Sequence, residues 1–258
     1  MLPTRTGHRR AAAAVLAAVL LAPLAGCGSG SDRGSAGAAR LTVLAASSLT
    51  DVFKTAGAAY EKSHPGTEVA FSFAGSQELA AQVRQGAPAG ALVTADTRTM
   101  ESLASDTGEA VVIARNRLVI ATEEGNPHRI GSLADLADSR LKVVLAAPQV
   151  PVGRYSRQIL DARGIEVRPV SQEPNVRAVL SKVELGEADA GLVYRTDAST
   201  AAGTTDAVDI PDDQNAVASY PAAPLKSAQD PGAAEAFVTW LSGPEAQKIL
   251  RDAGFQQP

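Results

Sequence analysis

Two strand-to-helix junctions, each carrying a serine, most constrain what this chain can fold into. The first runs from the apolar segment 41–46 through Ser47 and Ser48 into a helical pattern that starts at Leu49. The second runs from the alternating segment 68–73 through Gly75 and Ser76 into a further helix. Apolar residues that recur at i, i+3 and i+4 indicate a helix, whereas strict alternation indicates a strand. The chain is therefore predicted to begin its folded part as strand, helix, strand, helix.

A serine at a helix start can be a simple cap or part of an anion site. A helix N-terminus has unpaired N–H groups and the positive end of the helix dipole, so it can hold an oxyanion without a charged side chain. Ser48 followed by Asp51 also fits a capping box, which is the commoner role, and Ser76 is predicted to be the N-cap of its helix. Because ligands of open α/β sheets collect at the carboxyl ends of the strands, we expect both serines to face one point.

Strands and helices continue to alternate along the rest of the chain, which predicts an α/β fold with largely parallel sheets. The chain leaves its first lobe near Leu118 and returns near Val217. The expected division is a first lobe of residues 40–118 plus 217–258 and a second lobe of residues 119–216. Predicted strands include 115–122, 141–147, 167–170, 188–194 and 216–221, and predicted helices include 154–163, 176–186 and two within 231–253.

Residues 1–26 have the pattern of a lipoprotein signal peptide. Arginines precede the apolar run 11–24, which is shorter than the roughly 20 residues that a transmembrane helix needs. Cys27 is the only cysteine, so an internal disulfide and a cysteine metal cluster are excluded. A lone cysteine after a signal run resembles a bacterial lipobox, so Cys27 is the expected lipidation site. Residues 27–39 would then form the lipidated cysteine and a flexible Gly/Ser/Ala tether.

Composition argues against two other classes of function. The chain has 24 basic and 28 acidic residues, a formal charge of −4 and no basic stripe, so nucleic acid is not an expected partner. No serine lies in a Gly-x-Ser-x-Gly nucleophile motif, and no glycine-rich nucleotide-binding loop is present. We therefore expect a protein that is not an enzyme, with no cofactor and no side chain that directly ligates a cation.

Several short motifs follow one another along the chain: Leu-Ala-Ala-Ser-Ser-Leu-Thr-Asp at 44–51, Phe-Ser-Phe-Ala-Gly-Ser at 71–76, Gln-Gly-Ala-Pro-Ala at 85–89, Thr-Ala-Asp at 94–96, Val-Pro-Val-Gly-Arg-Tyr at 150–155, Asn-Val-Arg at 175–177 and Gly-Leu-Val-Tyr at 191–194. Together, and in this order, they resemble the molybdate-binding proteins of bacterial ABC transporters over nearly all of residues 40–258. The resemblance implies a periplasmic-binding-protein fold of type II, in which two lobes close on an oxyanion.

The resemblance also implies a ligand set made of neutral donors. Two serine hydroxyls come from the first lobe, main-chain N–H groups come from two loops of the second lobe, and one tyrosine hydroxyl completes the set. The residues that match are Ser48, Ser76, Val152, Val176 and Tyr194.

Three positions near this set depart from the pattern or add charge to it. Gly75 stands where such motifs frequently have serine, which removes one possible hydroxyl donor. Arg154 and Arg195 lie next to proposed contacts, and both are expected to point into water.

A site built only from donors suits a fully deprotonated dianion, because every N–H or O–H then meets a lone pair. Molybdate, tungstate and sulfate fit this description, whereas a phosphate site would favour a carboxylate acceptor. Asp51 and Glu78 are the carboxylates close in sequence to the first and the second serine junction, respectively. Each is expected to interact with the N–H groups of its own helix rather than with a ligand.

The expected function is capture of molybdate, and of tungstate with it, by a monomer that is lipid-anchored at the extracytoplasmic face of the cell membrane. The anion would pass to an ABC permease and its ATPase subunit, neither of which this chain contains. The alternatives are a binding protein for sulfate or phosphate, and a sensor lipoprotein or a hydrolase on the same fold.

Overall fold

The computed structural model describes residues 39–258, and these residues alternate between strands and helices as predicted. The predicted signal peptide and Cys27 lie outside the described residues. The strands are β1 (Ala39–Ala46), β2 (Thr67–Ala74), β3 (Ala91–Val93), β4 (Val111–Glu123), β5 (Val143–Ala146), β6 (Ser171–Glu173), β7 (Ala190–Tyr194), β8 (Thr205–Asp209) and β9 (Val217–Pro224). The α-helices are α1 (Thr50–Ser63), α2 (Ser76–Arg84), α3 (Thr97–Glu101), α4 (Pro151–Asp161), α5 (Val176–Glu184), α6 (Arg195–Thr200), α7 (Pro231–Leu241) and α8 (Pro244–Asp252), and the 3-10 turns are η1 (Ser47–Leu49), η2 (Leu133–Ala137) and η3 (Asp212–Gln214).

The strands of the described residues join in one nine-stranded sheet. Its order is β2-β1-β3-β9-β4-β7-β5-β6, and β8 pairs with β4 beside this path. β1 is parallel to β2 and β3, and β5 is parallel to β6 and β7. The central pairs β3–β9, β4–β9 and β4–β7 are antiparallel. The prediction of parallel strands therefore holds on both flanks, and the centre differs because β4 and β9 run in opposite directions.

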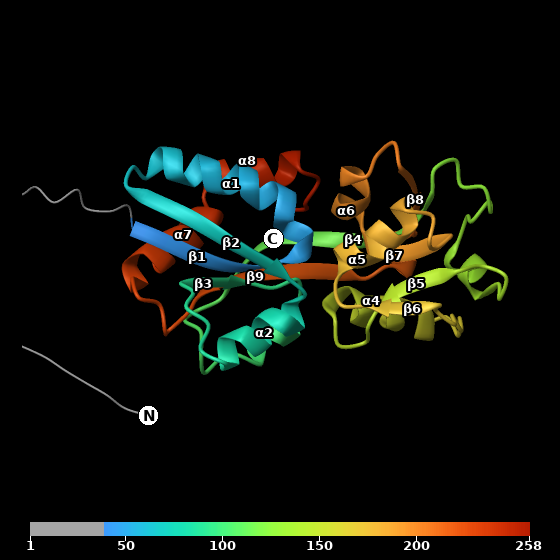
Figure 1. Cartoon of the computed structure of the whole chain (residues 1–258), viewed down its shortest axis with the longest axis horizontal. Helices are drawn as coiled ribbons and strands as arrows, with labels where there is room; N and C mark the ends of the chain where they lie inside the picture. The colour runs from blue at the N-terminus through green and yellow to red at the C-terminus, as the bar shows by residue number, and fades with distance from the viewer. Residues whose placement is uncertain (1–38) are drawn as a thin grey trace, which may run out of the picture. The chain divides into compact units, whose positions relative to one another are not determined.

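Figure 1 shows two groups of elements, with β4 and β9 running between them. The first lobe contains β1–β3 with α1, α2, α7 and α8, and the second contains β5–β8 with α4–α6. β4 pairs with β9 up to Arg117 and with β7 from Leu118 onward. The two-lobe α/β fold is thus as expected, while the residue limits of each lobe stay a prediction.

Core packing fixes the segment that carries the first serine junction. Leu49 and Phe53 are fully buried, and the Tyr60 ring of α1 meets the Phe237 ring edge-on, with 5.0 Å between centroids. Burying a large apolar side chain contributes about 1.5–3 kcal/mol, so these residues hold η1 and α1 firmly against the sheet.

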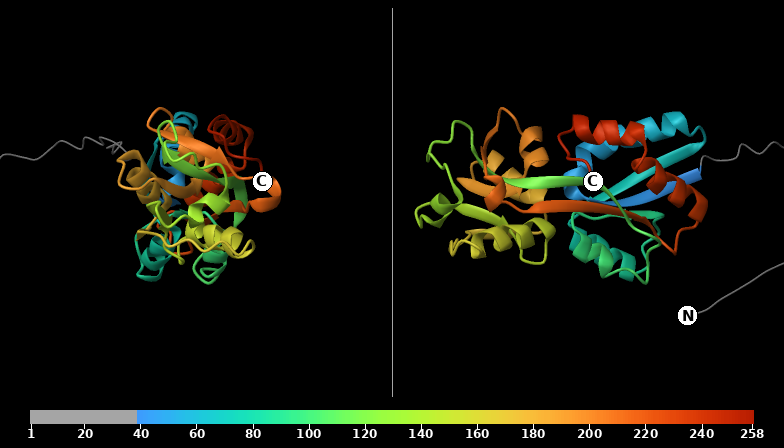
Figure 2. Two further views of the ribbon diagram at one scale, coloured as in Figure 1. Left: turned by 90° about the vertical axis from the view of Figure 1, so that its right-hand side faces the viewer. Right: turned by 180° about the vertical axis from the view of Figure 1, so that it is seen from behind.

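The end of the chain returns to the strands that connect the lobes (Figure 2). The N–H of Arg115 in β4 donates to the carbonyl of Gln256 at 2.9 Å, and the N–H of Gln256 donates back to Arg115, also at 2.9 Å. Phe255 meets the ring of Tyr220 in β9 edge-on, with 5.4 Å between centroids. The last residues therefore pack against both connecting strands.

One strand lies later in the sequence than predicted. Residues 167–170 are not a strand, and β6 instead pairs with β5 from Ser171 to Glu173. Pro169 has no N–H for a ladder bond, and β6 is a short edge strand of three polar residues. α6 and β8 were not predicted from the sequence. None of the described helices combines the length and the apolar character that crossing a membrane requires.

Candidate anion-binding site

All five predicted ligand residues line one pocket between the two lobes. The pocket has an empty volume of about 200 Å³, part of which is open to solvent. Its walls come from the carboxyl ends of β1, β2 and β7 and from the first turns of α2, α4 and α5. The lining residues in the described part of the chain include no carboxylate and no arginine or lysine; they are Ala46, Ser47, Ser48, Ala74, Gly75, Ser76, Ala95, Val150, Pro151, Val152, Asn175, Val176 and Tyr194.

Ser48 lies in η1, one turn before α1, and it does not cap that helix. The N-cap of α1 is Leu49, which makes no side-chain cap bond, so the predicted capping box is wrong. The 3-10 turn inserted after β1 moves the helix start past the serine. The Ser48 hydroxyl instead shares a hydrogen bond with the hydroxyl of Tyr220, with 3.0 Å between the oxygens. When Tyr220 donates, Ser48 keeps its own O–H for an anion.

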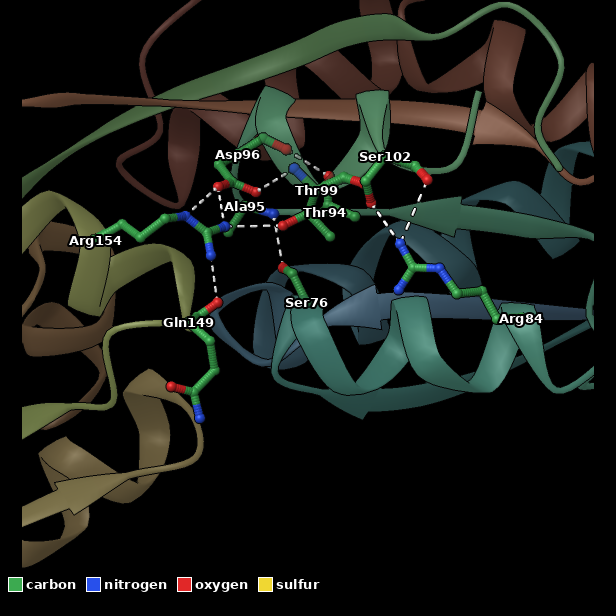
Figure 3. Close-up of polar contacts among 9 residues, drawn as sticks. All are labelled: Ser76, Arg84, Thr94, Ala95, Asp96, Thr99, Ser102, Gln149 and Arg154. Atoms are coloured by element: carbon green, nitrogen blue, oxygen red, sulfur yellow. Dashed lines mark hydrogen bonds and ion pairs between the residues drawn. The ribbon is translucent and has the colours of Figure 1, made fainter. Parts of the chain in front are cut away.

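Ser76 is the first residue of α2 rather than its N-cap, which is Gly75. Its Oγ accepts the N–H of Ala95 at 3.0 Å (Figure 3), which leaves the Ser76 O–H available as a donor. Glu78 accepts the N–H of Gly75 at 3.2 Å, as expected for its carboxylate. A Cβ on Gly75 would lie 2.5 Å from the carbonyl oxygen of Pro174, so the second lobe approaches too closely here for the serine that the family pattern favours.

The main-chain donors of the second lobe lie at two helix starts. Val152 is in the first turn of α4, whose N-cap makes no side-chain bond. Val176 is the first residue of α5, and the Asn175 side chain caps α5 by accepting the N–H of Ala178 at 3.0 Å. First-turn N–H groups have no acceptor within their own helix, so those of Val152 and Val176 are available to an anion at the positive ends of two helix dipoles.

Tyr194 ends β7, and its hydroxyl has no hydrogen-bond partner although the side chain is buried. Burial raises the pKa of Tyr194 well above its ordinary value, with smaller effects from Tyr220 and Tyr155, so the hydroxyl stays protonated. A buried unpaired hydroxyl costs about 1–3 kcal/mol, which a ligand that accepts its hydrogen bond would recover. Tyr194 is thus poised as a donor.

We expect Tyr194→Phe to weaken anion binding without weakening the fold. Removing one hydrogen bond to a charged ligand costs about 1.5–3 kcal/mol, or roughly 10–100-fold in affinity. The free energy of unfolding of the ligand-free chain should not fall, since the hydroxyl has no partner there. Calorimetric titration and chemical unfolding measure the two quantities. Tyr60→Phe, in the α1 core, is the matched control, and a Tyr194→Phe chain with lower stability but full affinity would contradict the assignment.

Arg154 lies between the lobes and does not point into water, so the prediction for it is wrong. Its guanidinium forms an ion pair with Asp96, with 3.0 Å between Nε and Oδ2, and donates to the Thr99 hydroxyl at 2.9 Å (Figure 3). It also donates to the carbonyl of Gln149. Arg195 pairs with Asp209 at 2.5 Å and does not line the pocket.

A second arginine bridge involves Arg177 of α5. Its guanidinium reaches Asp51 of α1 at 2.8 Å and the fully buried Asp197 of α6 at 2.6 Å. Asp51 was expected to serve its own helix amides, and the structure instead pairs it with the other lobe. Burial raises the pKa of Asp197 to about 6, although Arg177 acts in the opposite direction.

The raised pKa of Asp197 predicts a specific pH dependence of stability. Between the ordinary value of 3.8 and about 6, the folded chain keeps a proton on Asp197 that the unfolded chain has released. The contribution of this group to stability is therefore full below that window and is lost as the pH rises through it, by about 1.4 kcal/mol per pH unit. Asp197→Asn should remove this slope from the free energy of unfolding, measured by urea denaturation at a series of pH values. Asp161→Asn controls for net charge, and equal slopes in the variant and the unaltered chain would contradict the prediction.

One mixed cluster lies outside the pocket, within the part of the chain that the structure describes. Candidate ligand atoms of Glu123, His128 and Asp189 lie within 4.8 Å of one another, at the opposite end of β7 from Tyr194. His128 Nε2 is 3.5 Å from an oxygen of Asp189, so the two side chains partner each other without an ion. The expectation of no direct cation ligand stays a prediction.

The two lobes, the cleft between them and the set of neutral donors define a protein that binds a small solute. Residues 41–256 match the family described as bacterial extracellular solute-binding protein, and this chain belongs to that family. The predicted resemblance and fold class are thereby confirmed, and the relatives are solute-binding proteins rather than enzymes.

Relatives and solved structures agree with this family. The molybdate-binding protein ModA of Mycobacterium tuberculosis is 40% identical to this chain over 252 residues, which cover 95% of this chain and 97% of the relative. The periplasmic molybdate-binding protein of Azotobacter vinelandii has a TM-score of 0.75 at 23% identity, covering 84% of this chain and 99% of its own. The sulfate-binding protein SubI of M. tuberculosis has a TM-score of 0.76 at 18% identity, covering 85% of this chain and 87% of its own. At these identities the two structures establish the fold alone.

Proposed function

We propose that this protein captures molybdate in the cleft between its lobes and delivers it to an ABC permease. The observation that carries the proposal is the pocket itself, where two serine hydroxyls, two helix N-termini and the unpartnered hydroxyl of Tyr194 surround one space. Ser48, Ser76, Val152, Val176 and Tyr194 are the proposed ligands. The relative at 40% identity, named as a molybdate-binding protein, supports the same assignment.

The chemistry of the lining residues favours a dianion without a proton. Every polar group assigned to the ligand set is an N–H or O–H donor, and no carboxylate among the lining residues could accept a proton from the ligand. Each donor can therefore meet one lone pair of a tetrahedral oxyanion, and such charge-assisted bonds are stronger than neutral ones. Phosphate, which keeps a proton near neutral pH, is disfavoured.

Sulfate is the alternative with a specific observation behind it. It has the same charge and the same tetrahedral arrangement of acceptors, and SubI, named as a sulfate-binding protein, has the same fold. Donor type therefore separates molybdate from phosphate but not from sulfate. Molybdate and tungstate are larger than sulfate, so the size of the closed cavity selects between them.

The N-terminal sequence supports a tethered, extracytoplasmic location. We propose that residues 1–26 are removed, that Cys27 carries lipid, and that the following residues tether a monomeric binding domain to the outer face of the cell membrane. The family, described as extracellular, agrees with this location. Transport would require the permease and its ATPase as separate subunits.

Calorimetric titration of the chain from Gly28 onward tests the proposal. Molybdate, tungstate, sulfate and phosphate are added in turn to ligand-free protein. We expect tight binding of molybdate and tungstate at one site per chain, with weak or absent heats for the other two anions. Stronger binding of sulfate would identify sulfate, rather than molybdate, as the substrate. The absence of binding for all four anions would contradict the proposed function.

A further inference from the structure

We propose that the Arg154–Asp96 ion pair is a latch that holds the lobes closed over the bound anion and thereby sets how slowly the anion is released. In this view Arg154 and Asp96 are positioning residues: neither lines the pocket, and they act on the ligand through the lobes that carry it. The inference rests on the proposed function, because it concerns the residence time of the anion in that same site.

The contacts of Arg154 join the two lobes directly. Arg154 lies in α4 of the second lobe, and Asp96 follows β3 of the first. The guanidinium contacts the Asp96 carboxylate through two of its nitrogens, Nε and Nη2, and donates to the Thr99 hydroxyl, so one side chain makes several polar bonds across the cleft (Figure 3). Gln77 of α2 adds a nearby bond by donating to the carbonyl of Pro174 at 2.8 Å.

Burial indicates that the Arg154–Asp96 pair stabilises the closed lobes more than the Arg177–Asp51 pair does. The side chains of Arg154 and Asp96 are 21% and 6% exposed, whereas Asp51, the partner of Arg177 in the first lobe, is 49% exposed. An exposed ion pair contributes little because water and salt screen it, while a partner left alone in a buried pair is costly. Arg177 also keeps Asp197 in its own lobe when the lobes separate. Of these two bridges, the Arg154–Asp96 pair is the one in which both members would lose their main partner on opening.

The latch is tied mechanically to the proposed ligands. Asp96 is adjacent to Ala95, whose N–H donates to the Ser76 hydroxyl. Arg154 follows Val152 by two residues in the same helical turn. Forming the ion pair therefore brings the Ala95 segment, which holds Ser76, toward the first turn of α4, which carries Val152. Anion binding requires the same approach, so ion-pair formation and anion binding favour each other. Release of the anion requires the ion pair to open.

The test compares Arg154→Met with the unaltered chain in stopped-flow and calorimetric measurements of anion binding. Truncating one member of a desolvated, hydrogen-bonded charge pair acts mainly on dissociation, so we expect the dissociation rate to rise by about 30-fold or more with little change in the association rate. Adding Asp96→Asn should restore part of the loss, because it removes the unpaired charge while an asparagine can still cap α3 in place of the aspartate. Arg154→Lys should lie between.

The control is Arg140→Met, which also removes an arginine from an ion pair, but from an exposed pair with Asp138 inside the second lobe, where the Arg140 side chain is 87% exposed. It should leave both rates unchanged. An equal dissociation rate in Arg154→Met and the unaltered chain would overturn the latch. A dissociation rate in the Arg154→Met/Asp96→Asn double variant that is no lower than in Arg154→Met alone would also overturn it.

A second readout does not depend on which anion binds. The chain from Gly28 onward has no cysteine, so spin labels at Lys62→Cys and Arg168→Cys report the distance between lobes in the ligand-free protein. Arg154→Met should shift the distances toward longer values. If no anion binds the unaltered chain, the proposed function fails, and the spin-label distances alone decide for or against the latch.

Discussion

Replacing Ser48 and Ser76 together by alanine is expected to lower the affinity for molybdate by about two to four orders of magnitude, because each hydroxyl bond to a charged ligand contributes about 1.5–3 kcal/mol. Both hydroxyls line the pocket, and each can accept one bond from the protein, from Tyr220 or from Ala95, so each O–H can be directed at the ligand. Calorimetric titration of the double variant gives the loss directly.

The double variant also changes the protein itself, and this effect must be measured separately. Ser76→Ala leaves the buried N–H of Ala95 without its acceptor, which costs about 1–3 kcal/mol of stability. The free energy of unfolding should therefore fall by a similar amount, although the chain remains folded at 25 °C. Ser63→Ala/Ser199→Ala, which removes two hydroxyls from exposed helix positions, should leave the affinity unchanged. Retention of full affinity by Ser48→Ala/Ser76→Ala would rule out the proposed site.

Gly153→Ala is expected to damage both the stability of the second lobe and anion binding. A Cβ at this position would lie 2.1 Å from the carbonyl oxygen of Ala147 and 2.6 Å from that of Ala146. Both atoms belong to the backbone at the end of β5, so no side-chain rotation can relieve the clash. Overpacking typically costs about 1–3 kcal/mol, and a clash with rigid backbone on both sides belongs at the upper end of that range. Since α4 must move away, the N–H of Val152 leaves the pocket and the affinity should fall more than tenfold.

Thermal unfolding and titration of Gly153→Ala measure the two effects. Gly131→Ala is the matched control, because the atom nearest its Cβ would be the Asp135 carboxylate at 3.9 Å, an ordinary contact. It should unfold and bind like the unaltered chain. A Gly153→Ala chain with unchanged melting temperature and affinity would show that the junction of β5 and α4 yields easily, and the role given to the α4 N-terminus would then be wrong.

The parts of the fold that depend on local pattern could be predicted from the sequence. The paired serine junctions, the cap at Asn175 and the two C-terminal helices all follow from periodicity and from residues that favour helix starts. The same local signals placed Ser48, Ser76, Val176 and Tyr194 at strand ends or helix starts. They left Val152 in a loop ahead of a helix predicted from residue 154, whereas α4 begins at Pro151. It took the family resemblance to select the five residues as a set. All five line the same pocket.

Contacts between distant residues could not be predicted. Tyr220 reaches Ser48 across 172 positions of sequence, and Asp96 reaches Arg154 across 58. Neither pairing leaves a trace in periodicity or spacing, because strand order and lobe closure create it. The arginine at 154 looks like a surface residue in its own segment, and only the approach of the other lobe supplies its partner.

The packing of the chain end on the connecting strands has a practical consequence for anyone who handles the protein. Gln256 is bonded to Arg115, and Phe255 packs on Tyr220, whose hydroxyl holds Ser48. An affinity tag or fluorescent protein fused directly after Gln256 would therefore pull on β4 and β9, the strands that connect the lobes. Purification handles belong at the amino-terminal side, ahead of β1, in the segment that we propose as the lipid-linked tether.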